Sequence, residues 1–89
     1  MTMDPKYICF ERAHGCADMV IFPATGQHSD MAKALRLEKS EIVSAGFVSL
    51  EHHKCYGEST SLGRRAEPED TQIYRRLFNL EEYFEYLEK

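Results

Sequence analysis

The length of the chain is the feature that most constrains its fold. With 89 residues, the chain can build one hydrophobic core, so we expect a single domain over residues 1–89 with a frayed N-terminus over residues 1–5. A dinucleotide-binding fold, a (β/α)8 barrel and an enzyme cleft between two domains all need longer chains. The sequence therefore predicts a small domain built from few elements.

Charge and cysteine content exclude several classes of protein. Apolar residues make up 43% and charged residues 29% of the chain, as in globular proteins. A net charge of −4 argues against a basic surface that holds nucleic acid. No stretch approaches the roughly 20 apolar residues of a membrane span. Three cysteines, an odd number, and an N-terminus without an apolar signal region predict a cytoplasmic protein with reduced thiols.

Strands are predicted where aromatic and β-branched residues gather. Four stretches have this character: residues 6–11, 18–22, 42–50 and 55–59. The short connections at 12–17 and 51–54 join them into two antiparallel hairpins. Gly46, inside the third strand, indicates a bulge or another backbone that passes close.

Helices are predicted where apolar residues recur at helical spacing. One helix should begin near Ser29 or Asp30 and a second at Pro68, which occupies the first turn as prolines often do. A last amphipathic helix over residues 79–89 should start with a capping box at Asn79. The expected fold class is α+β: an antiparallel sheet of about four strands with the helices packed on one face.

The core should consist of the apolar members of these strands and helix faces. The residues expected to be buried are Ile8, Phe10, Val20, Phe22, Leu35, Val43, Phe47, Val48 and Leu77.

Cysteine and histidine side chains are candidate zinc ligands: Cys9, His14, Cys16, His28, His52, His53 and Cys55. Structural zinc sites usually pair their ligands at short spacing, and only His52 and Cys55 come close to such a spacing. Cys9 and Cys55 have apolar neighbours, among which a free cysteine behaves as a small hydrophobic residue. We therefore expect no metal and no cofactor, and keep metal binding by His52, His53 and Cys55 as the alternative.

Catalytic signatures are weak. A serine or cysteine nucleophile needs a positioned base and an orienting acid. Ser59, Ser61 and Cys55 lie near histidines in the sequence, but no Gly-x-Ser-x-Gly elbow is present. The chain is therefore expected not to be an enzyme.

A polar loop over residues 57–65 combines two glycines with hydroxyl groups and arginines. A phosphate-binding P-loop would need a lysine at a spacing that this loop lacks, and Glu58 would repel a phosphate. A solvated loop with local ion pairs is the favoured interpretation. An anionic ligand or an acidic partner held by Ser59, Ser61, Arg64 and Arg65 remains the alternative.

The C-terminal segment is the most informative feature for function. Its apolar residues Leu80, Tyr83, Phe84 and Leu87 lie at i, i+3, i+4 and i+7 of the expected helix and form one face. This face either completes the core or contacts a second copy or another protein, as an amphipathic helix does in a groove. Both interpretations stay open.

Several short segments carry a resemblance: Ser44-Ala45-Gly46-Phe47-Val48, Cys55-Tyr56-Gly57-Glu58-Ser59-x-Ser61-Leu62-Gly63 and Pro68-Glu69-Asp70, with Ile21-Phe22-Pro23 and His28. Over residues 6–78 the chain resembles small phage and prophage proteins that have no known activity. The resemblance brings no cofactor and no catalytic residue. It implies an accessory protein in the cytosol of a bacterial host that acts by binding host machinery.

Taken together, these features predict a non-enzymatic protein-interaction protein of phage type that binds a bacterial protein and can self-associate into a homodimer. The alternative is a small-ligand or metal-binding domain that uses the hairpin and loop over residues 52–65.

Overall fold

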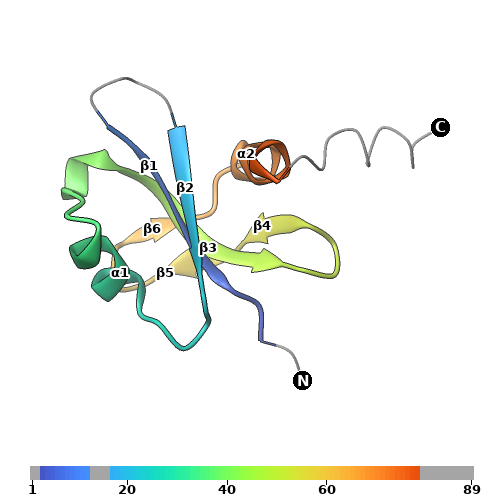
Figure 1. The fold of residues 1–89 in the computed structure, drawn as a ribbon, viewed down its shortest axis with the longest axis horizontal. Coiled ribbons are helices and arrows are strands. Elements are labelled where there is room, and N and C mark those ends of the chain that lie inside the picture. Colours follow the sequence, from blue (N-terminus) through green and yellow to red (C-terminus); the bar gives the residue numbers. More distant parts are fainter. Residues whose placement is uncertain (1–2, 13–16, 79–89) are drawn as a thin grey trace.

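The computed structural model describes residues 3–12 and 17–78. Its elements follow the chain in the order β1 (Lys6–Glu11), β2 (Ala17–Phe22), α1 (His28–Ala34), the 3-10 turn η1 (Lys39–Glu41), β3 (Ile42–Ser49), β4 (Lys54–Tyr56), β5 (Glu58–Ser59), β6 (Arg64–Arg65) and α2 (Asp70–Leu77) (Figure 1). None of the described helices is long and apolar enough to cross a membrane.

The main sheet has four antiparallel strands in the order β2-β1-β3-β4. β1 pairs with β2 along its full length, from Lys6 opposite Phe22 to Glu11 opposite Ala17. β3 returns beside β1 and pairs with β4 in the second hairpin. The α+β class, the four-stranded antiparallel sheet and both hairpins are therefore confirmed.

The helices lie on opposite faces of this sheet, so the expectation that they share one face is wrong. Ile8 packs in a cluster with Ala32 of α1, whereas its neighbours Tyr7 and Cys9 pack in a second cluster with Tyr74 of α2. Successive residues of a strand point to opposite faces, so α1 and α2 cover different faces. Figure 1 shows β2 nearest the viewer with α1 and α2 to either side.

The core is consequently split by the sheet into two layers. Buried members of the predicted core are Ile8, Phe22 and Val48, and partly buried members are Phe10, Val20, Leu35 and Phe47. The prediction omitted the buried residues Tyr7, Cys9, Ile42, Ala45 and Tyr74. Because both faces of β1 are covered, its central residues Tyr7, Ile8 and Cys9 are all fully buried.

Two residues of the predicted core are exposed, so their assignment is wrong. Val43 is 42% exposed because the register of β1 and β3 shifts here: Cys9 lies opposite Ser44, but Phe10 lies opposite Ile42. Val43 is thus the extra residue of a bulge and points away from the core. Leu77 is 50% exposed, although it lies on the helix face of Asp70, so the sheet covers α2 at Asp70 and Tyr74 but not at its last residue.

Gly46 is needed because another backbone passes close to it, one of the two roles expected for it. A Cβ atom at this position would overlap the carbonyl oxygen of Tyr56. The bulge, the other expected role, lies three residues earlier at Val43.

The segment over residues 57–65, predicted as a polar loop, contains a second, two-stranded sheet, so that prediction is wrong. Gly57, with φ of 80°, interrupts the expected return strand and separates β4 from β5. β5 then pairs with β6, with Glu58 opposite Arg65. The last described helix begins at Asp70, two residues after Pro68. The predicted helix over residues 79–89, with Leu80, Tyr83, Phe84 and Leu87, lies outside the described residues.

Candidate functional site

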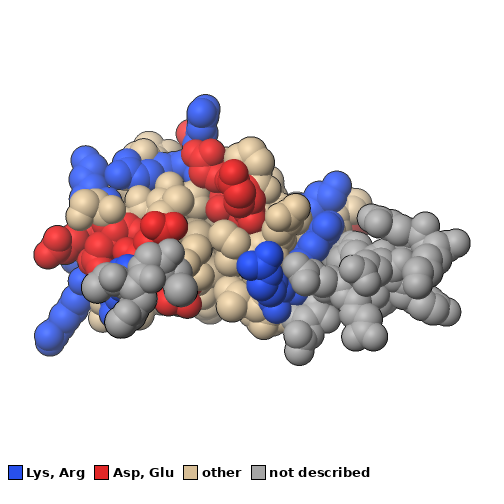
Figure 2. Space-filling view, turned by 90° about the horizontal axis from the view of Figure 1, so that it is seen from above, with Lys and Arg blue, Asp and Glu red and all other residues tan. Residues whose placement is uncertain are grey.

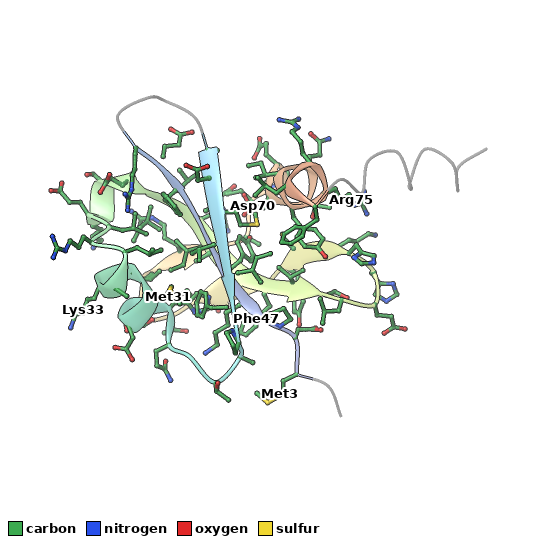
Figure 3. All side chains as sticks on the ribbon, in the orientation of Figure 1. Met3, Met31, Lys33, Phe47, Asp70 and Arg75 are labelled. Atoms are coloured by element: carbon green, nitrogen blue, oxygen red, sulfur yellow. The ribbon has the colours of Figure 1, made fainter. Side chains whose placement is uncertain are left out.

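The β5–β6 hairpin brings three of the four predicted loop residues to one open cavity of about 470 Å3. Its walls are formed by Glu58, Ser59, Thr60, Gly63, Arg64, Arg65 and Glu67. Ser61 does not line this cavity, but its Oγ lies 3.4 Å from Ser59 Oγ, and it lines a neighbouring groove of about 290 Å3 beside α1, whose walls include Lys33, Lys39 and Leu62. In Figure 3, Lys33 points outward from α1, away from the sheet.

Two of the side chains around this cavity, Arg64 and Ser59, are already used within the chain. Arg64 donates from Nε to the Ile42 carbonyl at 3.1 Å and from Nη2 to the Lys39 carbonyl at 3.4 Å. Ser59 is 2% exposed, and its Oγ accepts the Leu62 N–H. These contacts hold the hairpin against the start of β3 and give it a structural role.

The charges of the cavity also disfavour an anion. Glu58 and Glu67 line the same walls as the two arginines, so carboxylates offset the positive charge. Figure 2 shows acidic and basic side chains interspersed over the face seen from above, with uncharged surface between them. The cavity therefore offers no concentrated positive field for a phosphate or an acidic peptide.

The three predicted metal ligands are not arranged around a common point. His52 is exposed and lies 3.9 Å from a Glu51 carboxylate oxygen. His53 Nδ1 is hydrogen-bonded to Tyr74 Oη at 2.9 Å, and the His53 ring stacks on the Tyr74 ring. Burial raises the pKa of the Cys55 thiol to about 12. Within residues 3–12 and 17–78, no group of three or more His, Cys, Asp or Glu side chains could hold an ion.

A buried polar pair anchors α2 to the sheet and was not foreseen from the sequence. Tyr7 Oη of β1 donates to Asp70 Oδ2 at 2.5 Å, and both residues are almost fully buried. Asp70 Oδ2 also accepts the Glu67 N–H at 2.8 Å, which closes the turn before α2. Burial, and then the hydrogen bond to Asp70, raise the pKa of Tyr7, so the phenol stays a neutral donor. Figure 3 shows Asp70 on the side of α2 that faces the sheet.

His28, at the start of α1, is a second buried polar side chain. Its ring lies edge-on to Phe22 and Phe47, and its Nε2–H donates to the Gly46 carbonyl at 2.9 Å. Burial lowers its pKa below the ordinary value, against the opposing effect of this hydrogen bond. The buried imidazole is therefore a structural group that ties α1 to β3.

The two edges of the main sheet differ, and the hydrogen-bond pattern shows how. The Val48 N–H donates to the Pro5 carbonyl, so residues 5, 7 and 9 direct their backbone groups toward β3. The alternate residues, Lys6, Ile8 and Phe10, then direct theirs toward β2. By the same alternation, Asp18, Val20 and Phe22 bond to β1, and Ala17, Met19 and Ile21 direct their N–H and C=O groups outward.

The β4 edge is closed. Among the three residues of β4, Cys55 is the one whose N–H points outward, because Tyr56 and Lys54 bond to β3. Thr71 Oγ1 of α2 accepts this N–H at 3.0 Å. Helix α2 therefore satisfies the outward donor of this short strand.

The β2 edge is open over the part of the chain that the structure describes. No described strand lies on its outer side, and β2 faces the viewer in Figure 1. The strand has six residues and its outward backbone groups belong to Ala17, Met19 and Ile21, all uncharged. It contains no lysine, proline or bulge of the kind that usually protects an edge strand, and Asp18 is its one charge. This edge is the candidate functional site.

Sequence reasoning missed this site because it depends on the order of strands in the sheet. The same six residues would be fully paired if β2 lay in the centre. Comparison with known proteins adds no ligand or partner: no family model, no curated protein and no solved structure matches the chain.

Proposed function

We propose that this chain is a small non-enzymatic protein-interaction protein that binds its partner by adding a strand to the open edge of β2. In keeping with the resemblance to phage and prophage proteins, we propose that it works as an accessory protein in the cytosol of a bacterial host, on a host protein.

The observation that carries this proposal is the row of outward backbone groups at Ala17, Met19 and Ile21. An extended segment of a partner could accept and donate hydrogen bonds along this row, as in strand-addition complexes. The side chains of β2 alternate between the two helix-covered faces, and those of Met19, Val20 and Ile21 are partly exposed. They supply apolar contacts to the partner's side chains on both faces.

A second exposed apolar surface supports the proposal that this chain is a protein-interaction protein. Leu77 and Phe78 are 50% and 55% exposed at the end of the described chain, directly before the segment that carries Leu80, Tyr83, Phe84 and Leu87. We propose that this C-terminal segment contributes a further protein contact. The cavity at the β5–β6 hairpin supports a ligand-binding function less well, because Arg64 is committed to backbone carbonyls and its neighbours include two carboxylates.

The test uses the full chain as bait in a bacterial lysate, with three forms compared. Met19→Pro removes an outward N–H without removing a bond to β1, and proline is tolerated where a strand's N–H faces outward. Met3→Ser is the matched control, because Met3 is 69% exposed and lies outside β2. We expect a protein that the parent and Met3→Ser capture and Met19→Pro does not. Equal capture by a folded Met19→Pro variant would refute edge binding.

A further inference from the structure

The backbone of β2 specifies the kind of strand that fits its edge. The outward groups alternate along Ala17, Met19 and Ile21, so a partner strand must present its own groups at every second residue. It should also be apolar at its centre, because Met19, Val20 and Ile21 have no charge with which to match a charged partner. β2 itself meets both requirements.

Symmetry limits how two β2 strands can pair. Two antiparallel copies of one strand are related by a two-fold axis perpendicular to the sheet, which keeps each side chain on its own face. A residue can then lie only opposite a residue of the same parity, since neighbouring residues point to opposite faces. Registers centred on a residue are allowed, and registers centred between two residues are excluded.

We propose, resting on the proposed function and naming its partner as a second copy of this chain, that two molecules pair through β2 with Met19 opposite Met19. This register places Ala17 opposite Ile21, so all three outward residues form hydrogen-bonded pairs. The register centred on Val20 would instead place Ala17 opposite Pro23, which has no N–H to donate. The result is a continuous antiparallel sheet across the two copies.

The side chains are compatible with this register. Ala17, Met19 and Ile21 pack on the α2 side of the sheet, so the two Met19 side chains meet on that face. Asp18 shares the opposite face with Val20 and Phe22 and comes to lie opposite Val20 of the second copy. The single charge of the strand therefore does not face its own copy, which avoids a destabilising pair of like charges.

The size of the contact predicts a weak dimer. A strand pair of this length buries less than the roughly 800 Å2 per partner of a stable protein–protein interface. We therefore expect a reversible dimer that forms at concentrations on the order of micromolar to millimolar. A dimer this weak dissociates readily, so a strand of a host protein can displace the second copy from the β2 edge.

The decisive measurement is sedimentation of the full chain over a range of concentrations. We expect the parent to move from 10.3 kDa toward twice that mass as the concentration rises. Met19→Pro should stay at 10.3 kDa at every concentration. Ala17→Pro serves as a second edge variant in case Met19→Pro does not fold, because it also removes an outward N–H. Met3→Ser should dimerise as the parent does.

Three results would overturn the inference. The first is a parent that stays monomeric at millimolar concentration, and the second is a set of folded edge variants that dimerise like the parent. The third is a dimer that only Phe84→Glu dissociates, which would place the contact in the C-terminal segment. The two proposals fail separately. A monomeric parent whose Met19→Pro variant still loses the host protein removes the dimer and leaves the proposed function. If instead the parent dimerises through β2 and the edge variants still capture the host protein, the dimer stands and the proposed binding of the host protein at this edge fails.

The register has its own test. In a Cys16→Ser background, with oxidised glutathione as oxidant, Met19→Cys should form a disulfide-linked dimer, because the paired Cα atoms of this register lie within disulfide range. Val20→Cys is the matched comparison and should give less cross-linked dimer. Preferential cross-linking of Val20→Cys would show that the strands pair in the neighbouring register and would overturn the proposed one.

Discussion

Removal of the Tyr7 hydroxyl should destabilise the fold far more than removal of the Tyr56 hydroxyl. Both tyrosines donate to an aspartate, Tyr7 to Asp70 at 2.5 Å and Tyr56 to Asp4 at 2.6 Å. The chemistry is the same but the surroundings differ, because Tyr7 and Asp70 are 0% and 1% exposed and Tyr56 is 45% exposed. The two substitutions thus compare one hydrogen bond in the interior and one at the surface.

The expected magnitudes follow from burial. Tyr7→Phe leaves the buried Asp70 carboxyl with the Glu67 N–H as its remaining donor, and an incompletely satisfied buried polar group costs about 1–3 kcal/mol. We expect a loss of about 2–3 kcal/mol, a large part of the roughly 4–13 kcal/mol typical of a domain this size. Tyr56→Phe should cost less than about 0.5 kcal/mol, because water replaces the lost partner at the surface.

The assay is urea denaturation followed by far-UV circular dichroism for Tyr7→Phe, Asp70→Ala, the double variant and Tyr56→Phe. The double-mutant cycle isolates the interaction between Tyr7 and Asp70, and we expect a coupling energy of about 1.5–3 kcal/mol. A coupling energy near zero, or equal losses for Tyr7→Phe and Tyr56→Phe, would refute the view that this pair anchors α2 to the sheet.

Three further predictions address the interior. Burial lowers the pKa of His28, so the unfolded chain binds a proton at this residue more readily than the folded chain does. The free energy of unfolding should therefore fall as the pH falls below about 6.5. In urea titrations from pH 8 to 5, His28→Gln should make this fall smaller. Gly46→Ala should cost more than Gly63→Ala: a Cβ at Gly46 overlaps the backbone carbonyl of Tyr56, whereas a Cβ at Gly63 meets open space and adds only the roughly 1–2 kcal/mol of its left-handed φ of 65°. Equal melting temperatures of the two variants would contradict this. Burial raises the pKa of the Cys9 thiol to about 11, and Cys9 is fully buried, so this thiol should react with a disulfide reagent only as fast as the chain opens. Rapid labelling of Cys9 in the folded protein would count against its burial.

The strands of the main sheet were predictable because local composition and short connections decide them. Residues 6–11 and the hairpin that follows needed only aromatic and β-branched residues with a brief turn between them. That helices cover both faces of the sheet was harder to predict from the sequence. Tyr7, Ile8 and Cys9 are three consecutive residues without a polar position, a pattern typical of a strand buried on both sides, yet each is also common at half-buried positions.

The β5–β6 hairpin was not predictable from its residues. Polar side chains dominate this segment, and the interaction that orders it is Arg64 donating to carbonyls 22 and 25 residues away in the sequence. Such contacts depend on where the backbone of β3 begins, which composition does not reveal. The Tyr7–Asp70 pair is hidden for the same reason, since the two residues are 63 positions apart.

Covering both faces of the sheet also determines where the molecule can be recognised. A four-stranded sheet with one bare face usually binds through that face, but here α1 and α2 occupy both. Its backbone can then be reached only at the edges. α2 satisfies the outward N–H of β4 through Thr71, which leaves β2 as the edge with unpaired groups among the described residues. Under the proposed function, the arrangement of helices that makes the core possible therefore also leaves one strand, Ala17–Phe22, as the place where another chain would join the sheet.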